Sequence, residues 1–177
     1  MTATSSPTAI DTSWERFEAL YRASRDDVYA YVATLLRDRA GAEDVTALAF
    51  ERAYRRRRSF DRARGEERAW LFGIARNAAL DELRRRRRHA RLAVDPEDPL
   101  AADALASGED LADEAARRAA LRAALDQLAP RERELVALKF HAGLTNAEIA
   151  RVLGVSESNA GTLLHRTMAK LRKACDA

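Results

Sequence analysis

The chain has 177 residues, and its abundance of alanine, leucine, arginine and glutamate beside 7 glycines and 4 prolines favours an all-α fold in one domain or two small ones. The net charge of +3 is unevenly spread, at −3 over residues 1–50, +9 over 51–91, −8 over 92–116 and +5 over 117–177. The single cysteine excludes an internal disulfide or a thiolate metal cage, and the lack of a signal sequence or bilayer-length apolar run predicts a cytoplasmic protein without membrane insertion.

Three helices are predicted in the N-terminal half. Residues 14–36 carry apolar side chains at three- and four-residue steps, which gives a long helix one apolar face. Gly41 then interrupts the pattern, and a second helix continues the same period over residues 45–58. The polar stretch 59–65 lacks periodicity, and a third helix follows over residues 70–88, ending in five arginines. Together these helices are expected to form one small bundle.

The next segment changes character. Residues 92–114 contain eight acidic side chains, no basic one and no consistent apolar face, and Pro96, Pro99 and Gly108 punctuate them. We therefore expect an acidic flexible linker here, and a disordered tail over residues 1–12. Because local charge governs polyanion binding, the two basic blocks on either side of the linker indicate two contacts with nucleic acid. Solvated helix faces are the alternative interpretation of each charge run.

A second helical unit is predicted beyond the linker. Residues 116–128 are amphipathic, and Pro130 suits the first turn of a helix that ends near Gly143. The apolar positions expected in that helix are Leu135, Val136, Leu138 and Phe140.

The sharpest local motif is the capping box at Thr145 and Glu148, whose hydroxyl and carboxylate can satisfy the first amides of a helix. That helix breaks at Gly154, and another begins at Ser156. A small Ala150, where two helices must approach, completes the pattern of a helix-turn-helix, although a hairpin used only for packing has the same spacing.

In a helix-turn-helix, the second helix enters the major groove of DNA, led by its N-terminal residues. Side chains expected near base edges are Ser156, Glu157, Ser158, Asn159 and Thr162. Side chains placed to meet phosphates are His165, Arg166, Lys170 and Arg172.

The stretch from Leu128 to Arg166, with Pro130, the Asn146–Gly154 helix and Val155-Ser156-Glu157, resembles region four of bacterial sigma factors. The N-terminal half resembles the same family: Gly41–Val45 with Phe50 is similar to region 2.2, and residues 70–77 with the arginines at 84 and 85 are similar to regions 2.3 and 2.4. Two ordered motifs identify the chain as similar to the extracytoplasmic-function group of the sigma-70 family.

This resemblance implies a region 2 domain over residues 13–91 and a region 4 domain over 115–177, joined by the linker. It implies core RNA polymerase and promoter DNA as partners, and it allows an anti-sigma factor. Polymerase contacts are expected from Asp44, Leu48, Phe50 and Tyr54. Minus-10 contacts are expected from Ser59, Phe60, Arg62, Arg64, Arg76, Asn77, Arg84 and Arg85. The helix-turn-helix residues from Ser156 to Arg166 would read the minus-35 element.

Four features need a functional and a structural interpretation side by side. The polar loop 59–65 beside a basic helix is a plausible receptor for an extruded base. Trp70 fits the apolar period as a core residue, and could instead stack on an unpaired base. Asn77 could bond a base edge or lie on a solvated face. The acidic linker either passes along a channel built for nucleic acid or serves as a solvated tether.

The chain departs from the family's pattern at two places. Ala47-Leu48 replaces a glutamine followed by an acid in region 2.2, so apolar contacts would have to replace polar docking. Gly161 and Leu163 replace a lysine and an arginine, which removes two cations from the recognition helix. Altered reading of the minus-35 element is therefore expected.

Other function classes find less support. There is no glycine-rich phosphate loop or nucleophile elbow, and the three histidines lie far apart in the sequence. We therefore expect no enzymatic activity, no catalytic residue, no small-molecule substrate, no metal and no cofactor. The remaining rival is a helix-turn-helix regulator that binds duplex DNA without joining the polymerase.

Overall fold

The structure is a computed structural model that describes residues 12–92 and 112–175. These residues form seven α-helices and two short 3₁₀ helices and contain no strand, which confirms the all-helical expectation. The predicted tail and most of the predicted linker lie outside the described residues. The elements are α1 (Thr12–Leu36), α2 (Arg39–Arg56), η1 (Arg57–Ser59), η2 (Arg62–Arg64), α3 (Glu67–Leu92), α4 (Ala112–Asp126), α5 (Pro130–Phe140), α6 (Asn146–Leu153) and α7 (Glu157–Cys175).

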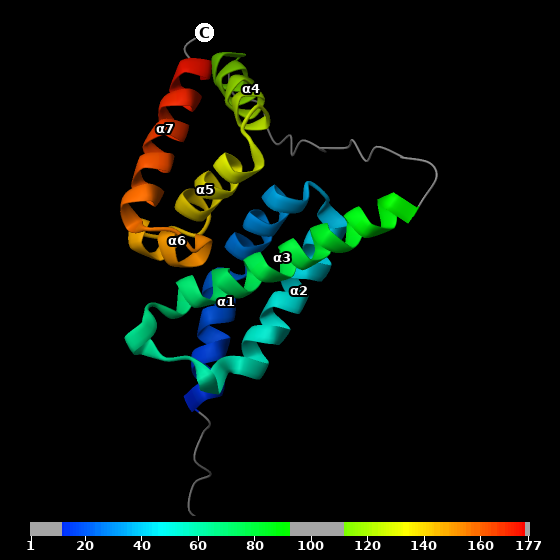
Figure 1. Cartoon of the computed structure of the whole chain (residues 1–177), viewed down its shortest axis with the longest axis vertical. Helices are drawn as coiled ribbons and strands as arrows, with labels where there is room; N and C mark the ends of the chain where they lie inside the picture. The colour runs from blue at the N-terminus through cyan, green and yellow to red at the C-terminus, as the bar shows by residue number, and fades with distance from the viewer. Residues whose placement is uncertain (1–11, 93–111, 176–177) are drawn as a thin grey trace, which may run out of the picture.

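Helices α1, α2 and α3 pack against one another in the lower part of Figure 1. The apolar faces anticipated by the sequence meet between them, and the largest fully buried side chains of this core are Tyr31, Phe72 and Leu71. The rings of Tyr31 and Phe72 meet edge to face at 5.4 Å between centroids. Such contacts add to area burial, so the three helices hold each other in one arrangement.

The expected break at Gly41 is wrong. Helix α2 begins at Arg39, so Gly41 lies within its first turn, and the chain reverses earlier, at Arg37, whose φ is +53°. Asp38 caps the helix by accepting a hydrogen bond from the Gly41 amide at 3.1 Å. Glycine fits there because an added Cβ would collide with the side chains of Arg86 and Asp38. The glycine therefore marks a close approach of helices.

Helices α4 to α7 form the upper part of Figure 1, with α7 packed against α4, α5 and α6. Leu135 and Leu138 of α5 are buried, whereas the side chain of Phe140, another apolar position of the expected helix, is 62% exposed. Two residues correspond to about 200° around a helix, so Phe140 faces away from the side that Leu138 buries.

The two groups of helices share one core. Helix α5 packs on α1 and α6 packs on α3, and a continuous cluster of buried side chains runs from Val28 and Phe72 to Leu138 and Ile149. The sequence does not predict this contact, because an intervening linker suggests two independent units. Among the described residues, no helix is long and apolar enough to cross a membrane.

Two apolar side chains of α5 differ in burial and can be compared directly. Replacing Leu138 with Ala should lower the free energy of unfolding by about 2–5 kcal/mol, since the methyl groups are lost from a filled core. The exposed Phe140→Ala variant should change it by about 0.5 kcal/mol or less. Urea unfolding followed by circular dichroism measures both, and equal losses would contradict the assignment of inner and outer faces.

Candidate nucleic-acid interface

Helices α6 and α7 form the predicted helix-turn-helix. The Thr145 amide donates to the Glu148 carboxylate at 2.7 Å, and the Glu148 amide donates to the Thr145 hydroxyl at 3.3 Å, so the capping box is confirmed. Gly154 ends α6 in the left-handed conformation at φ +68°. The Ser156 hydroxyl then accepts from the Asn159 amide at 3.2 Å and caps α7. Each turn residue expected from the sequence has its local role.

The outer face of α7 is open to solvent. All seven side chains expected to read DNA are exposed: Ser156, Glu157, Ser158, Asn159, Thr162, His165 and Arg166. Ala160, Thr167 and Leu171 are buried on the opposite face and fix the helix on its support. A helix with this exposure can enter a major groove.

Gly161 and Leu163, the two residues of α7 that depart from the family's pattern, are less exposed than the residues expected to read DNA. Leu163 packs against the buried core, so its side chain belongs to the inner face of α7. Gly161 is half-buried, and a Cβ there would lie 3.5 Å from the Asn146 amide nitrogen, an ordinary contact. The Leu163 replacement therefore acts on packing in this arrangement.

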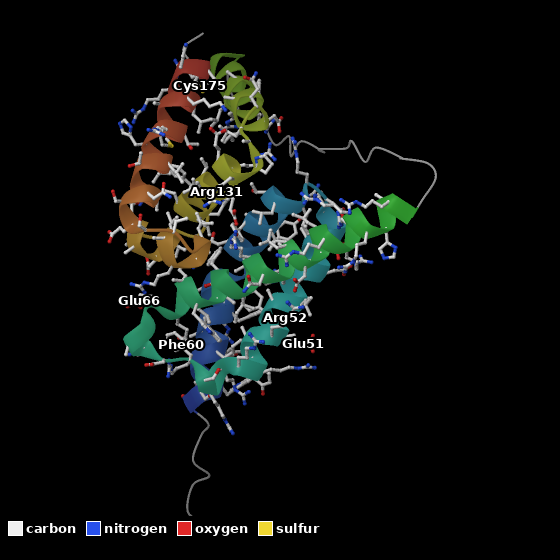
Figure 2. The ribbon with its side chains drawn as sticks, viewed as in Figure 1. Glu51, Arg52, Phe60, Glu66, Arg131 and Cys175 are labelled. Carbon is white, nitrogen blue, oxygen red and sulfur yellow. The ribbon has the colours of Figure 1, made fainter. Side chains whose placement is uncertain are left out.

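The loop between α2 and α3 borders a groove of about 410 Å³. Ser59, Phe60, Trp70 and Asn77 line it, and Arg151 of α6 lies on its other wall. Phe60, labelled in Figure 2, contacts Trp70 with ring centroids 5.4 Å apart. Trp70 also packs against the core, so one aromatic side chain serves both the core and the groove.

Among the remaining loop residues, Arg62 is exposed. Arg64 lies in η2, and its side chain is not among those that the structure describes. Asn77 is exposed at the groove. Polar and aromatic groups around such a hollow are the kinds of group that hold an unpaired base.

Arg76 is the exception among the predicted DNA-binding residues, because it is not directed to solvent. Its Nε lies 2.7 Å from a carboxylate oxygen of Glu134, and only 21% of the Arg76 side chain and 10% of the Glu134 side chain are exposed. The hydroxyl of Tyr31 donates to the same oxygen at 3.2 Å. Burial, reinforced by the nearby Glu134, raises the pKa of Tyr31 well above its ordinary value, so Tyr31 remains the donor.

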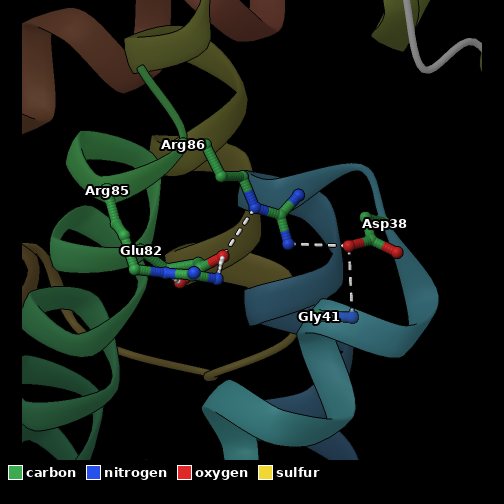
Figure 3. Close-up of polar contacts among 5 residues, drawn as sticks. All are labelled: Asp38, Gly41, Glu82, Arg85 and Arg86. Atoms are coloured by element: carbon green, nitrogen blue, oxygen red, sulfur yellow. Dashed lines mark hydrogen bonds and ion pairs between the residues drawn. The ribbon is translucent and has the colours of Figure 1, made fainter. Parts of the chain in front are cut away.

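The C-terminal part of α3 holds exposed arginines beside acidic partners. Arg84 pairs with Asp81 at 3.1 Å, and Arg85 makes two bonds to Glu82, at 2.7 and 2.8 Å. Glu82 also accepts a hydrogen bond from Arg86 at 2.7 Å, the dashed contact drawn in Figure 3. The hydrogen bonds from Arg85 and Arg86 lower the pKa of Glu82 to about 2.

Arg86 continues this network to another helix. Its Nη2 lies 2.7 Å from a carboxylate oxygen of Asp38, the residue that caps α2 (Figure 3). Exposed pairs within one helix are weak, so Arg84 and Arg85 can exchange their acidic partners for phosphate. Arg86 has a structural contact that they lack.

The predicted polymerase-binding residues lie on α2 at different depths. Asp44 is exposed and Leu48 is half-buried. Phe50 is only 5% exposed and contacts the rings of Phe17 and Tyr21 in an edge-to-face manner. Tyr54 is half-buried in the same aromatic cluster. Of these four residues, only Phe50 is therefore buried, and Asp44, Leu48 and Tyr54 keep surface that a partner could contact.

Sequence reasoning does not single out Arg68, which lies two turns before Arg76 on α3. Its guanidinium donates to the carbonyl oxygens of Ala142 at 2.6 Å and His141 at 3.2 Å, and it pairs with Asp27 at 2.6 Å. The eight-residue spacing places Arg68 and Arg76 near the same face of α3, and this spacing is the sequence feature that could have indicated a shared structural role. The identity of their partners, however, depends on tertiary contacts.

Metal binding has no structural support within the described ranges. No group of three or more histidine, cysteine, aspartate or glutamate side chains gathers there as a metal site would require. The charged groups on these surfaces instead suit polyanion contacts.

Two family models match the chain in order. Sigma-70 region 2 matches residues 20–89, and Sigma-70 region 4 matches residues 118–171. The chain is 37% identical over 160 residues to the ECF RNA polymerase sigma factor BldN of Streptomyces coelicolor, covering 90% of this chain and 60% of that relative. It is 27% identical over 167 residues to the ECF RNA polymerase sigma factor SigK of Mycobacterium tuberculosis strain H37Rv, covering 90% and 86%.

Solved structures share the fold. The sigma factor RpoE in complex with the anti-sigma factor NepR from Bartonella quintana matches with a TM-score of 0.70 at 21% identity, over 95% of this chain and 99% of that one. CnrH in complex with the cytosolic domain of CnrY matches with a TM-score of 0.63 at 27% identity, over 92% and 89%.

The Glu82 network predicts a specific titration. Because the folded pKa lies below the ordinary carboxyl value, the network stabilises the fold above that value, and this contribution is lost as the pH falls towards 2. Carboxyl-carbon NMR should find the Glu82 midpoint near 2, and Arg85→Ala should raise it. Arg84→Ala is the matched control, since Arg84 pairs with Asp81, and an equal rise there would refute the assignment.

The arginines at the end of α3 also predict a salt effect. Replacing Arg84 and Arg85 with Ala should weaken binding to duplex DNA and reduce the slope of log affinity against log salt by about 0.9 per lost phosphate contact. The control replaces the exposed Arg22 and Arg25 of α1, which changes the charge equally. Fluorescence anisotropy at several salt concentrations measures the slope, and an unchanged value in the α3 variant would exclude these contacts.

Proposed function

The chain belongs to the extracytoplasmic-function group of the sigma-70 family, and from this membership we propose that it binds core RNA polymerase and directs promoter recognition, DNA melting and transcription initiation. The observation that carries the proposal is the ordered match to regions 2 and 4 on one chain, together with an exposed recognition face on α7. The chain spans 60% of the length of BldN, so the proposal rests on the two regions that the chain itself contains.

We divide the chain into a region 2 domain over residues 13–91, an acidic linker over 92–114 and a region 4 domain over 115–177. The family-model matches fall inside the two proposed domains. In this division the N-terminal domain opens and reads the minus-10 element, whereas the C-terminal domain reads the minus-35 element as a duplex.

The minus-35 contacts are assigned to the exposed face of α7. Side chains near its N-terminus, from Ser156 to Thr162, are offered to base edges, while His165 and Arg166 lie one turn further for phosphate contact. The exposure of all seven predicted residues supports this role. None of them has to move for DNA to approach.

The minus-10 contacts are assigned to the loop, the groove and the basic end of α3. The groove beside Phe60 and Trp70 offers aromatic contact for an unpaired base, and Asn77 offers an amide. Arg84 and Arg85 extend the contact along the phosphate backbone. Arg76 joins them only after it leaves Glu134.

Docking on the polymerase clamp is assigned to the outer face of α2, with Asp44 as a charged contact and Leu48 as an apolar one. Phe50 and Tyr54 support this face from beneath through the aromatic cluster with Phe17. Ala47 is exposed beside them, so the face is less polar than the family's usual one.

The proposed role is recognition, without enzymatic turnover by the chain itself, and it places the protein in the cytoplasm, where polymerase and promoter are found. An anti-sigma protein is a further proposed partner. RpoE in complex with NepR shows this kind of partnership for a chain of the same fold.

Run-off transcription tests the proposal. Purified core polymerase from the source bacterium, supplied with the chain and genomic fragments, should yield specific transcripts that core alone does not produce. Asp44→Arg should weaken core binding about tenfold, because it reverses a charge on the proposed docking face. Glu15→Arg makes the same charge change at an exposed position of α1 and should bind core as the unaltered chain does.

Failure to join core would leave a different function. A chain that binds duplex DNA but never forms a complex with core in size-exclusion chromatography is a regulator that uses only its helix-turn-helix. Formation of the complex without specific transcripts would contradict the promoter-directing role.

A further inference from the structure

Gly73 lies in the interior of α3, where glycine is unfavourable. Relative to alanine, glycine destabilises the interior of a helix because its backbone loses more freedom on folding. A Cβ at Gly41 or Gly65 would collide with an arginine side chain, and this close approach accounts for those two glycines. A Cβ at Gly73 would meet no described atom within 4 Å, although the residue is half-buried. Packing within the described part of the chain therefore does not require glycine at this position.

The open space at Gly73 belongs to the groove beside the loop that follows α2. Gly73 lines this groove of about 410 Å³ together with Phe60, Trp70 and Asn77. Steps of three and four residues place Trp70, Gly73 and Asn77 along one face of α3. This part of the groove is therefore formed by the loop and α3, and its wall is bare main chain at Gly73.

Aromatic rings and an amide lie on either side of the bare main chain. The ring centroids of Phe60 and Trp70 are 5.4 Å apart, and aromatic side chains stack on the π-face of any base. Asn77 is exposed, and side chains of an α-helix lean towards its N-terminus, so Asn77 covers the turn that contains Gly73. Its amide offers a donor and an acceptor to the edge of a base. A base that stacks on the aromatic pair would therefore extend over Gly73 towards Asn77.

The two classes of base differ in how far they reach along this face. The spacing from Trp70 to Asn77 corresponds to about 10 Å along the helix axis. A purine has two fused rings and a pyrimidine has one, so a purine extends further from the aromatic pair towards the amide. A side chain at residue 73 would stand between the two and shorten the space. A pyrimidine needs less of that space and would be less affected.

We propose that Gly73 determines which class of unpaired base the groove accepts, because the bare main chain leaves room for a purine between the aromatic pair and Asn77. A side chain at residue 73 restricts the groove to a pyrimidine. This inference rests on the proposed function, which brings an unpaired base to the groove, and it adds the class of base and the residue that selects it.

Two variants fill the open space to different extents. Gly73→Ala adds one methyl group, and Gly73→Leu adds a branched side chain. Ala90→Leu is the matched control, since it adds apolar bulk at an exposed position of the same helix, about 25 Å further along its axis. Gly73→Ala should raise the thermal unfolding midpoint by about 1–4 °C, because alanine replaces glycine in a helix without a clash. A lower midpoint would contradict the open space.

The preference for a base is measured on the full chain with labelled single strands of oligodeoxyadenosine and oligothymidine. Strands of about eight nucleotides suit one protein site. Fluorescence anisotropy gives the two affinities, and their ratio is compared between variants, so that stacking within the free strands cancels. The ratio of adenosine to thymidine affinity should fall about threefold in Gly73→Ala and about tenfold in Gly73→Leu, within the range that one stacked base contributes. Ala90→Leu should keep the ratio of the unaltered chain.

The fluorescence of Trp70 reports whether a base enters the groove. The chain has two tryptophans, so Trp14→Phe, introduced into every variant, leaves Trp70 as the only one. Oligodeoxyadenosine should quench the emission of Trp70 in the parent with Gly73, and this quenching should be lost in Gly73→Leu. An absence of quenching by either strand in the parent would overturn the proposal.

A stability that rises while the purine preference falls supports the selecting role, because a purely structural glycine would not move the two in opposite directions. An unchanged ratio in Gly73→Leu, or equal losses for both strands, would overturn it. Run-off transcription separates this result from the proposed function. A chain that initiates transcription but shows one ratio in all variants loses only the role of Gly73, whereas a chain that never joins core but shows the altered ratios keeps it.

Discussion

One buried carboxylate holds the two halves of this chain in register. Glu134 of α5 accepts hydrogen bonds from the Tyr31 hydroxyl of α1 and from the Arg76 guanidinium of α3. The ring of Tyr31 packs on Phe72 in the N-terminal core. The ring of this tyrosine therefore packs within the N-terminal bundle, while its hydroxyl makes a hydrogen bond to the C-terminal helices. Because removing charges from water is costly, the pair adds little net stability, but loss of either partner would leave the other charge buried and uncompensated.

The basic block of the sequence divides into two kinds of arginine. One kind holds the fold together through contacts with other segments: Arg76 pairs with Glu134 of α5, Arg86 with Asp38 before α2, and Arg68 donates to the Ala142 carbonyl after α5. Arg84 and Arg85 are exposed and pair with acids on their own helix. An excess of nine positive charges over residues 51–91 therefore overstates the field that the folded molecule presents to nucleic acid.

The sequence was sufficient to predict features that depend on neighbouring residues in the chain. The capping box at Thr145, the left-handed Gly154 and the outward face of α7 follow from spacing and residue type, and the structure has all three. It was insufficient for contacts between distant segments: Arg76 reads as a phosphate ligand until Glu134, 58 residues further along, is seen beside it. The apolar pattern of α5 included Phe140 as well as Leu138, but periodicity alone does not tell where the buried arc ends, and the structure leaves Phe140 exposed.

The meeting of α2 and α3 at Gly41 restricts how this chain can diverge. Asp38 caps α2 and pairs with Arg86, and the guanidinium fills the space where a side chain at residue 41 would stand. A larger residue at 41 requires the flexible Arg86 guanidinium to move away or the arginine to shorten, and either change leaves the aspartate with its cap alone. These three positions are expected to change together during evolution, so their joint variation among descendants would trace the lineage of this helix pair.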